Sequence, residues 1–138
     1  MLPDADRSRL LEAATLAAAQ AYAPYSHFRV GAAVLTEQGT VHAGCNVENA
    51  SYGLTICAER NALFQMVASA PRPLAVRALL VYTPTLTPTT PCGACRQVLL
   101  EFGSRSGVDV LCVCDGLDEI AATLDQLVPL SFGPRSLD

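Results

Sequence analysis

The segment Val76-Arg-Ala-Leu-Leu-Val-Tyr82 is a nearly continuous apolar run in the middle of the chain. It predicts a strand that is covered on both faces, because a strand with one face in water alternates polar and apolar residues. Apolar residues with helical spacing occupy residues 57–68 before it and about 92–102 after it. A buried strand between two helices indicates an α/β domain in which helices pack on a mainly internal sheet.

Four further strands are expected around this central strand. The turn residues Glu37-Gln38-Gly39 predict a hairpin between two of them, and Asp115-Gly116 predicts a two-residue turn between two others. The run from Val108 to Val113 is apolar enough to be buried like the central strand. The four predicted strands cover residues 29–35, 40–47, 108–113 and about 119–122.

Helices are expected at both ends of the chain. Asp4 is placed to cap a helix that runs to about Tyr22, where Pro24 follows, and a short last helix covers about residues 124–128. No linker or internal repeat interrupts the pattern. The sequence therefore predicts one domain over residues 1–138, a three-layer α/β/α arrangement around a mixed five-stranded sheet. The expected apolar face of the first helix is Leu10, Leu11, Ala14, Leu16 and Ala18.

The composition limits the partners of the protein. The chain has 138 residues, 51% of them hydrophobic, and a net charge of −4. All nine basic residues are arginines, and they are scattered without a run, so a nucleic-acid partner is disfavoured and a small neutral substrate is expected. The uncharged stretch 78–95 holds three prolines and does not predict a membrane span. The first residues lack a secretory pattern, which predicts a cytoplasmic protein.

Six cysteines stand in this short chain. Three disulfides would need an oxidising compartment, so metal ligation or plain burial is favoured. Cys92-Gly-Ala-Cys95 alone fits either a zinc half-site or a redox dithiol. Pro91 before it suits a helix start, where exposed N–H groups stabilise thiolates, and the pair follows the third predicted strand, whereas thioredoxin-type motifs follow the first. Metal binding is the preferred interpretation.

A third cysteine begins the other helix, in Cys57-Ala-Glu59. Three thiolates without an obvious fourth protein ligand indicate a catalytic zinc site, since a structural site closes with a fourth ligand. Glu59 is too close to Cys57 to chelate the same ion and is placed to move protons to and from a water on the metal. The alternative role for Glu59 is an acid that stabilises the first turn of a helix.

An electron-rich site of three thiolates needs a nearby cation. Arg60 is expected to donate a hydrogen bond to a thiolate, and Arg96 is a weaker candidate for the same role. His27 and His42 are expected to be surface or hydrogen-bonded histidines and not ligands. Cys112 and Cys114, which share one strand face, are expected to be buried, and no role is assigned to Cys45.

Five spaced segments resemble the small homotetrameric, zinc-dependent cytidine deaminases over roughly residues 20–134. The pattern typical of zinc deaminases, a His- or Cys-x-Glu followed by Pro-Cys-x-x-Cys, is present as Cys57-Ala-Glu59 and Pro91-Cys-Gly-Ala-Cys95. The segments that carry the resemblance are Tyr25-Ser-His-Phe-Arg-Val-Gly-Ala-Ala33, Gly44-Cys-Asn-Val-Glu-Asn-Ala50, Cys57-Ala-Glu-Arg60, Pro91-Cys-Gly-Ala-Cys-Arg-Gln97 and Ser131-Phe-Gly-Pro134.

The resemblance implies contacts that spacing alone does not predict. Phe28 would pack on the pyrimidine ring, Asn46 and Glu48 would hold the ribose hydroxyls, and the backbone N–H of Ala58 would meet the base carbonyl. Tyr52 and Phe132 would complete the pocket of a neighbouring subunit in a homotetramer. From the residues alone, core packing for Phe28, a turn for Asn46 and a solvated loop acid for Glu48 remain open.

The resemblance also implies the reaction, hydrolytic deamination of cytidine and 2′-deoxycytidine in pyrimidine salvage, with one Zn²⁺ per chain. Three alternatives stay open at this point. Deaminases of blasticidin-type antibiotics share the cysteine motifs but differ around residues 46–48 and at the Ser-Phe-Gly-Pro end. Base editors of RNA or DNA are disfavoured by the missing basic charge and by the hairpin expected at Asp115-Gly116. A structural zinc module would need no Glu59.

Overall fold

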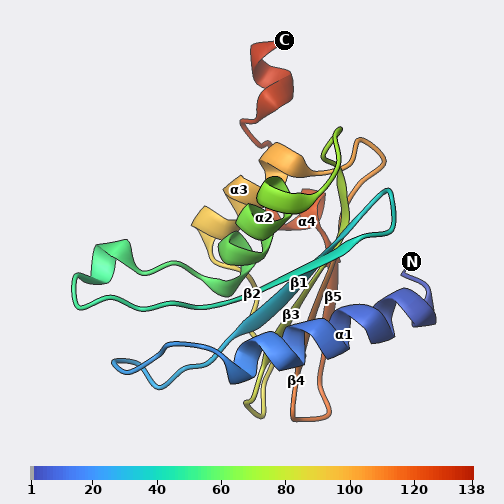
Figure 1. Ribbon diagram of the computed structural model, residues 1–138. Coiled ribbons are helices and arrows are strands. Elements are labelled where there is room, and N and C mark those ends of the chain that lie inside the picture. The colour runs from blue at the N-terminus through green and yellow to red at the C-terminus, as the bar shows by residue number, and fades with distance from the viewer. Residues whose placement is uncertain (1) are drawn as a thin grey trace.

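A computed structural model describes residues 2–138, with a sheet between two layers of helices (Figure 1). In chain order the elements are α1 (Asp4–Ala19), β1 (Gly31–Thr36), β2 (Val41–Cys45), the 3-10 turn η1 (Tyr52–Leu54), α2 (Ala58–Ser69), β3 (Val76–Thr83), α3 (Gly93–Phe102), β4 (Asp109–Cys114), β5 (Ile120–Thr123), α4 (Leu124–Leu127) and the 3-10 turn η2 (Pro134–Leu137).

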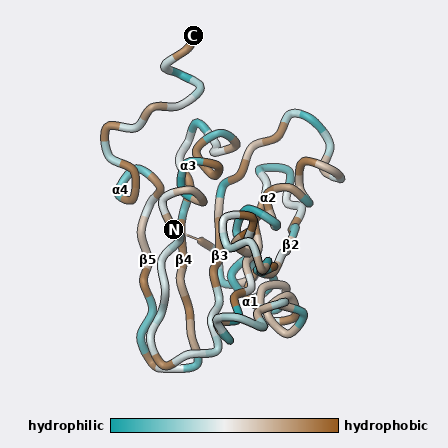
Figure 2. Tube along the Cα trace, turned by 90° about the vertical axis from the view of Figure 1, so that its left-hand side faces the viewer, coloured by the Kyte–Doolittle hydropathy of each residue, from teal (hydrophilic) through white to brown (hydrophobic). Residues whose placement is uncertain are grey.

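The sheet has five strands in the order β2-β1-β3-β4-β5. β3 and β4 run parallel, whereas the other three pairs are antiparallel, which makes the sheet mixed as predicted. Figure 2 shows β5, β4 and β3 standing side by side from another direction. The parallel step from β3 to β4 requires a crossover, and α3 supplies it. This crossover places the start of α3 near the start of α2.

Each face of the sheet has its own core. On one face Leu10 and Ala14 of α1 pack with Leu35 and Leu80 of the strands. On the other face α2 and α3 pack on the alternate strand residues, with Leu63 and Met66 fully buried at the centre. β3 therefore carries apolar residues on both sides, which is why its sequence is almost continuously apolar. The predicted three-layer α/β/α fold is confirmed.

Two glycines let the helices approach the strands closely. A Cβ built on Gly31 of β1 would lie 1.8 Å from the carbonyl oxygen of Ala14 in α1. A Cβ on Gly44 of β2 would lie 2.4 Å from the backbone nitrogen of Ala62 in α2. The backbones of helix and strand are in direct contact at both points, which fixes the start of α2 against the end of β2.

The structure corrects three details of the expected elements. Pro3 and not Asp4 is the N-cap of α1, so the Asp4 carboxylate makes no cap bond, and the helix ends at Ala19, three residues earlier than expected. Leu16 is 65% exposed and does not belong to the buried face. The prediction of a two-residue turn at Asp115-Gly116 is wrong as well, because the connection from β4 to β5 runs over residues 115–119.

The cysteines outside the two motifs differ in burial. Cys112 is fully buried in the core under α2 and α3, as expected. Cys114 is only partly buried, and its thiol donates to the carbonyl oxygen of Asp118 over 3.3 Å, which corrects the expectation of a second buried thiol. The difference arises because Cys114 is the last residue of β4 and the irregular connection passes beside it.

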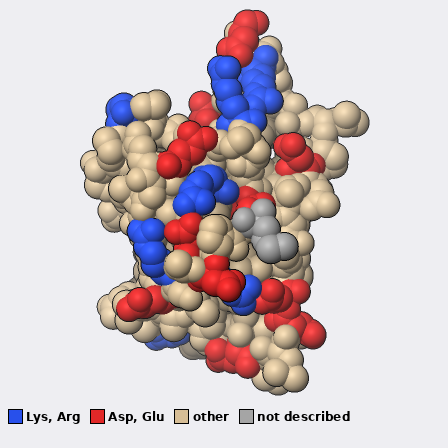
Figure 3. Space-filling view, turned by 90° about the vertical axis from the view of Figure 1, so that its right-hand side faces the viewer, with Lys and Arg blue, Asp and Glu red and all other residues tan. Residues whose placement is uncertain are grey.

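Charges on the surface are mixed. On the face shown in Figure 3, acidic and basic side chains lie interspersed without a continuous basic stripe. Ion pairs join several of them, including Arg7 with Glu119 and Arg77 with Asp6. No helix within residues 2–138 combines the length and the hydrophobicity that a membrane crossing requires.

Candidate metal centre

Three sulfur atoms meet where α2 and α3 begin. The Sγ atoms of Cys57, Cys92 and Cys95 all lie within 4.8 Å of one another. The Cys57 and Cys92 sulfurs are 3.8 Å apart. Two sulfurs in a tetrahedral zinc site with Zn–S bonds of about 2.3 Å are separated by about 3.8 Å, so the Cys57–Cys92 pair has the spacing that such an ion needs. The sequence prediction of these three residues as one cluster agrees with this geometry.

Helix ends position the three thiols. Cys57 and Cys92 are the N-caps of α2 and α3, both with extended backbone, at ψ 155° and ψ 167°. Neither side chain makes a cap hydrogen bond to the described chain, so both thiols are free to bind a metal. Cys95 lies one turn into α3 and is buried. Unpaired N–H groups and the positive helix end stabilise thiolates here.

Arg60 supplies the cation that the thiolates need. Its Nη2 donates to the Cys57 sulfur over 3.4 Å, as predicted. Hydrogen bonds from the Cys95 thiol and from Arg60 lower the pKa of Cys57 to about 5, against the opposing effect of burial. The bond to Cys57 and burial in turn raise the pKa of Cys95. In this arrangement Cys57 ionises before Cys95.

A second nitrogen of the Arg60 guanidinium is left without a partner in the described chain. Its Nε is buried and has no hydrogen-bond partner within residues 2–138. A buried N–H without an acceptor is costly, so this donor favours additional negative charge at the cluster. Three thiolates around a divalent metal carry one net negative charge, and the second donor of Arg60 suits that charge.

Glu59 is the second residue of α2 and is only 5% exposed. Burial raises the pKa of its carboxyl above the ordinary value, and the charge of Cys57 acts in the same direction. Cys112 lies within reach of the same carboxylate, and burial followed by the charge of Glu59 raises the pKa of Cys112 to about 12. A buried acid with a raised pKa beside an open metal position is suited to accept and return protons.

Arg96 does not touch the sulfurs, which corrects its weaker assignment as a thiolate donor. Its Nε donates to the carbonyl oxygen of Pro91 over 2.7 Å, and its Nη2 donates to the Thr90 hydroxyl over 3.2 Å. Its Nη1 donates to the carbonyl oxygen of Leu127 over 3.0 Å. The guanidinium holds the loop that leads into Cys92 from outside the metal cluster.

Asn46 anchors the segment that carries Phe28. Its side-chain oxygen accepts from the Val30 N–H over 2.9 Å, and its amide nitrogen donates to the Phe28 carbonyl oxygen over 2.7 Å. Asn46 is 7% exposed, whereas Phe28 is 38% exposed and follows His27, which has a φ of 57°. The structure thus links Asn46 to the backbone on both sides of Arg29.

Glu48 holds the loop on the other side of Phe28. Its carboxylate accepts from the backbone N–H groups of Tyr25 at 2.9 Å and Ser26 at 3.1 Å and also from the Ser26 hydroxyl. These bonds, that of the Ser26 hydroxyl first, lower the pKa of Glu48. With Tyr25 and Tyr52, whose rings meet edge to face at 5.8 Å, Glu48 lines a cavity of about 360 Å³.

The remaining predicted residues differ in their surroundings. Ala58 is the first residue of α2 and is fully buried beside Cys57. Tyr52 and Phe132 are 74% and 65% exposed, and within residues 2–138 no hydrogen bond or ring contact joins either one to the sulfur cluster. His42 is hydrogen-bonded to Thr40 and Ser69, as expected of a histidine that is not a ligand.

The partners of the site residues were not predicted from the sequence. Tyr25 and Ser26 lie in one of the quoted segments, but their bonds to Glu48 depend on how two distant loops meet. Gln97 also lies in a quoted segment, and its amide donates to the Phe132 carbonyl oxygen over 3.0 Å. A polar residue shortly after the last metal cysteine was the available signal for Gln97.

A family model agrees with this geometry over most of the chain. Residues 4–110 match the family described as "Cytidine and deoxycytidylate deaminase zinc-binding region". The matched range contains the three cysteines, Glu59 and Arg60. The metal that the sulfur cluster holds is therefore zinc.

Curated relatives match nearly end to end. A cytidine deaminase of Halalkalibacterium halodurans is 51% identical over 134 residues, which cover 96% of this chain and 98% of the relative. A cytidine deaminase of Sporosarcina psychrophila is 43% identical over 132 residues, which cover 96% of this chain and 95% of the relative.

Solved structures are similar as well. The crystal structure of cytidine deaminase from Burkholderia pseudomallei has a TM-score of 0.82 at 47% identity, covering 91% of this chain and 98% of that one. The crystal structure of cytidine deaminase from Mycobacterium tuberculosis has a TM-score of 0.77 at 42% identity, covering 94% of this chain and 99% of that one. The fold, the cysteine cluster and the sequence therefore agree.

Proposed function

Because the chain belongs to the zinc-dependent cytidine deaminase family, we propose that Glu59 moves the protons in its hydrolytic deamination of cytidine. The observation that carries this proposal is a buried carboxyl with a raised pKa beside a three-sulfur cluster. Cys57, Cys92 and Cys95 hold the zinc ion, which leaves one tetrahedral position free of protein. A purely structural zinc site would not require a buried carboxyl beside the cluster.

The reaction converts cytidine and water into uridine and ammonia. When bound here, zinc would lower the pKa of a coordinated water toward neutrality and so supply the nucleophile for C4 of the base. Glu59 accepts one proton of that water and delivers it to ring N3, where it remains in the product. It then accepts the second proton and passes it to the amine at C4, which leaves as ammonia. Both protons of the water are thereby accounted for.

The substrate contacts form the second part of the proposal. Phe28 packs against the pyrimidine ring, and the N–H of Ala58, at the start of α2, donates to the base carbonyl. Asn46 and Glu48 hold the ribose hydroxyls. Asn46 uses one N–H and one lone pair for the backbone around Phe28, which leaves one of each for a sugar hydroxyl. Glu48 is held in place by its three bonds to residues 25–26.

The third part of the proposal concerns the assembly. Tyr52 and Phe132 are large aromatic side chains that this chain alone leaves mostly in solvent. We place each of them in the pocket of a neighbouring subunit of a homotetramer, where that area is removed from water. The proposed substrates include 2′-deoxycytidine, which keeps its 3′- and 5′-hydroxyls for Asn46 and Glu48, and the proposed role is pyrimidine salvage in the cytoplasm.

The direct test measures ammonia release and zinc content together. Purified protein is incubated with cytidine, 2′-deoxycytidine, CMP and adenosine, and Glu59→Gln is assayed in parallel. We expect ammonia from the two cytosine nucleosides, about one zinc per chain in both proteins, and a loss of at least about 10²-fold in turnover for Glu59→Gln. Full zinc content without ammonia from either nucleoside would overturn the proposal and leave a structural zinc module.

A further inference from the structure

Arg96 joins three segments of the chain at the start of α3. Its guanidinium donates to the carbonyl oxygen of Pro91 and the hydroxyl of Thr90, in the loop that ends at Cys92. Its third bond reaches the carbonyl oxygen of Leu127, the last residue of α4. Three hydrogen bonds from one half-buried side chain fix the relative position of the metal-binding loop and the end of α4.

The same side of α3 holds the segment that follows α4, residues 128–138, which we call the carboxyl-terminal arm. Gln97 donates to the Phe132 carbonyl oxygen over 3.0 Å, and Leu100 packs close to Gly133. Val128, the first residue of the arm, packs against the core and donates its N–H to the Leu124 carbonyl oxygen, whereas Leu130 and Leu137 beyond it are 106% and 77% exposed. It projects from the body of the molecule in Figure 1.

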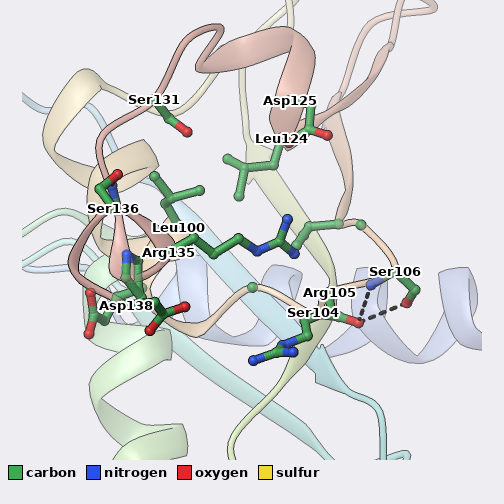
Figure 4. Close-up of a pocket in the computed structure, with 16 residues that line it drawn as sticks. Leu100, Ser104, Arg105, Ser106, Leu124, Asp125, Ser131, Arg135, Ser136 and Asp138 are labelled. Atoms are coloured by element: carbon green, nitrogen blue, oxygen red, sulfur yellow. Dashed lines mark hydrogen bonds between the residues drawn. The ribbon is translucent and has the colours of Figure 1, made fainter.

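A cavity separates much of the arm from the body. It has a volume of about 470 Å³ and lies between the end of α3, the start of α4 and the arm. Figure 4 shows Leu100 and Leu124 on the side of the body and Ser131, Ser136 and Asp138 on the side of the arm. None of the residues proposed to bind zinc or substrate lines this cavity. Beyond Val128, the bond of Gln97 to Phe132 and the contact of Leu100 with Gly133 attach the arm to α3, and Arg96 holds Leu127 just before the arm begins.

We propose that Arg96 is a positioning residue that couples the zinc ligands Cys92 and Cys95 to the carboxyl-terminal arm. Zinc fixes the first turn of α3, and Arg96 and Gln97 lie on that turn or directly after it. A fixed turn holds the acceptors Leu127 and Phe132 more firmly than a mobile one. The coupling is reciprocal: if bound zinc favours the attached arm, the attached arm favours zinc binding by the same factor.

The consequence for catalysis rests on the proposed function, because it is there that Phe132 enters a neighbouring pocket. If Phe132 serves the neighbour, zinc in one subunit promotes substrate binding in the next through α3 and the arm. The coupling within one chain does not depend on that role. It is measured without any substrate, so its failure and the failure of the proposed function are distinguishable.

The test uses the zinc-loaded full chain and three variants. Arg96→Met keeps the side-chain length and removes all three bonds, while Gln97→Leu removes the arm contact and leaves the metal loop untouched. Arg72→Met is the matched control, because Arg72 also donates to a backbone carbonyl, that of Val67, at the far end of α2. The readouts are the rate of zinc transfer to a chromogenic chelator, the absorption bands of the cobalt-substituted protein and hydrogen exchange in residues 128–138.

We expect zinc transfer to accelerate about tenfold in Arg96→Met, with shifted cobalt bands. Gln97→Leu is expected to accelerate it about threefold by reciprocity, and the control to leave it unchanged. Removing zinc from the unmutated protein is expected to speed hydrogen exchange in the arm several-fold. Unchanged zinc transfer in Gln97→Leu, or equal exchange with and without zinc, would overturn the coupling. Both results remain decisive if Arg96→Met fails to fold.

Discussion

The guanidinium of Arg60 donates to the sulfur of Cys57 from three residues further along α2, over 3.4 Å. The thiol and the cation that stabilises its ionised form thus belong to the same helical turn. The start of α2 carries both, and its backbone is held by the close contact with β2 at Gly44. The electrostatics of the site are therefore determined where the helix begins, before any metal binds.

Replacing Arg60 by Gln is expected to weaken zinc binding about 10-fold to 100-fold, the usual cost of losing a partner of a metal ligand. In the metal-free protein the pKa of Cys57 rises from about 5, because one of its two main stabilising hydrogen bonds is gone. Competition with a chelator measures the affinity. Alkylation of Cys57 against pH, followed by peptide mapping, measures the ionisation, and a thiol that alkylates as in the unmutated protein would contradict the prediction.

Replacing Glu59 by Gln is expected to stabilise the metal-free protein at neutral pH. The pKa of Glu59 is raised by burial above its ordinary value of 4.5. Protonated Glu59 therefore leaves the free energy of unfolding undiminished below about pH 4.5. This stability is lost as the pH rises through the raised pKa of the folded protein. The neutral amide avoids this loss. We expect a Tm about 4 °C higher at pH 7.5, a shift that corresponds to roughly 1 kcal/mol.

The pH dependence provides the control for this stability prediction. Thermal unfolding of the two metal-free proteins is followed from pH 4 to pH 8. The difference in Tm should shrink as the pH approaches 4, where Glu59 is protonated in the folded chain and mostly protonated in the unfolded chain. A difference that stays constant over the whole range would show that ionisation of Glu59 is not its origin.

Replacing Asn46 by Ala is expected to lower the free energy of unfolding by about 2 kcal/mol, because the Val30 N–H and the Phe28 carbonyl lose their partners. The KM for cytidine should rise as the Phe28 segment loosens. Urea unfolding and steady-state kinetics measure the two effects. Asn49→Ala is the matched control, since Asn49 is exposed and its side chain accepts from Ser51 N–H over 2.8 Å. Equal unfolding midpoints for the two variants would contradict the prediction.

Replacing Gly44 by Ala is expected to destabilise the fold by about 3 kcal/mol, since the new Cβ would lie 2.4 Å from the Ala62 nitrogen and α2 must move away from β2. Because α2 carries Cys57 and Glu59, zinc affinity should fall as well. Gly53→Ala is the control, as nothing lies within 4 Å of a Cβ there. Urea unfolding compares the two variants, and similar losses at both positions would refute the packing argument.

Local patterns in the sequence were sufficient to predict that Cys57, Cys92 and Cys95 lie together, and to predict most of the helices and strands. Pro91-Cys92 and Cys57 each mark a helix start, and a helix start dictates where a side chain points over the next few residues. The apolar run at residues 76–82 likewise predicted β3 and the two-sided core, because burial on both faces leaves no position for a polar residue.

Features that depend on distant segments could not be predicted in this way. Arg96 binds a carbonyl oxygen 31 residues away, and backbone carbonyls carry no sequence signal. Leu16 is two residues from both Ala14 and Ala18, so at about 100° per residue it lies on the opposite side of α1 from the buried face and is 65% exposed. The connection after β4 is longer than Asp115-Gly116 suggested, since the pairing of Cys112 with Ile120 fixes its length.

The two N-cap cysteines are 35 positions apart, with all of α2 and β3 between them. During folding, the metal site therefore forms late. No two of its ligands from different helices meet until β3 has joined the sheet and α3 has packed beside α2, which is a non-local and hence slow event. Once bound, the ion closes a long loop and opposes its reopening. Retention of the metal thus reports that the central part of the chain has reached its native topology.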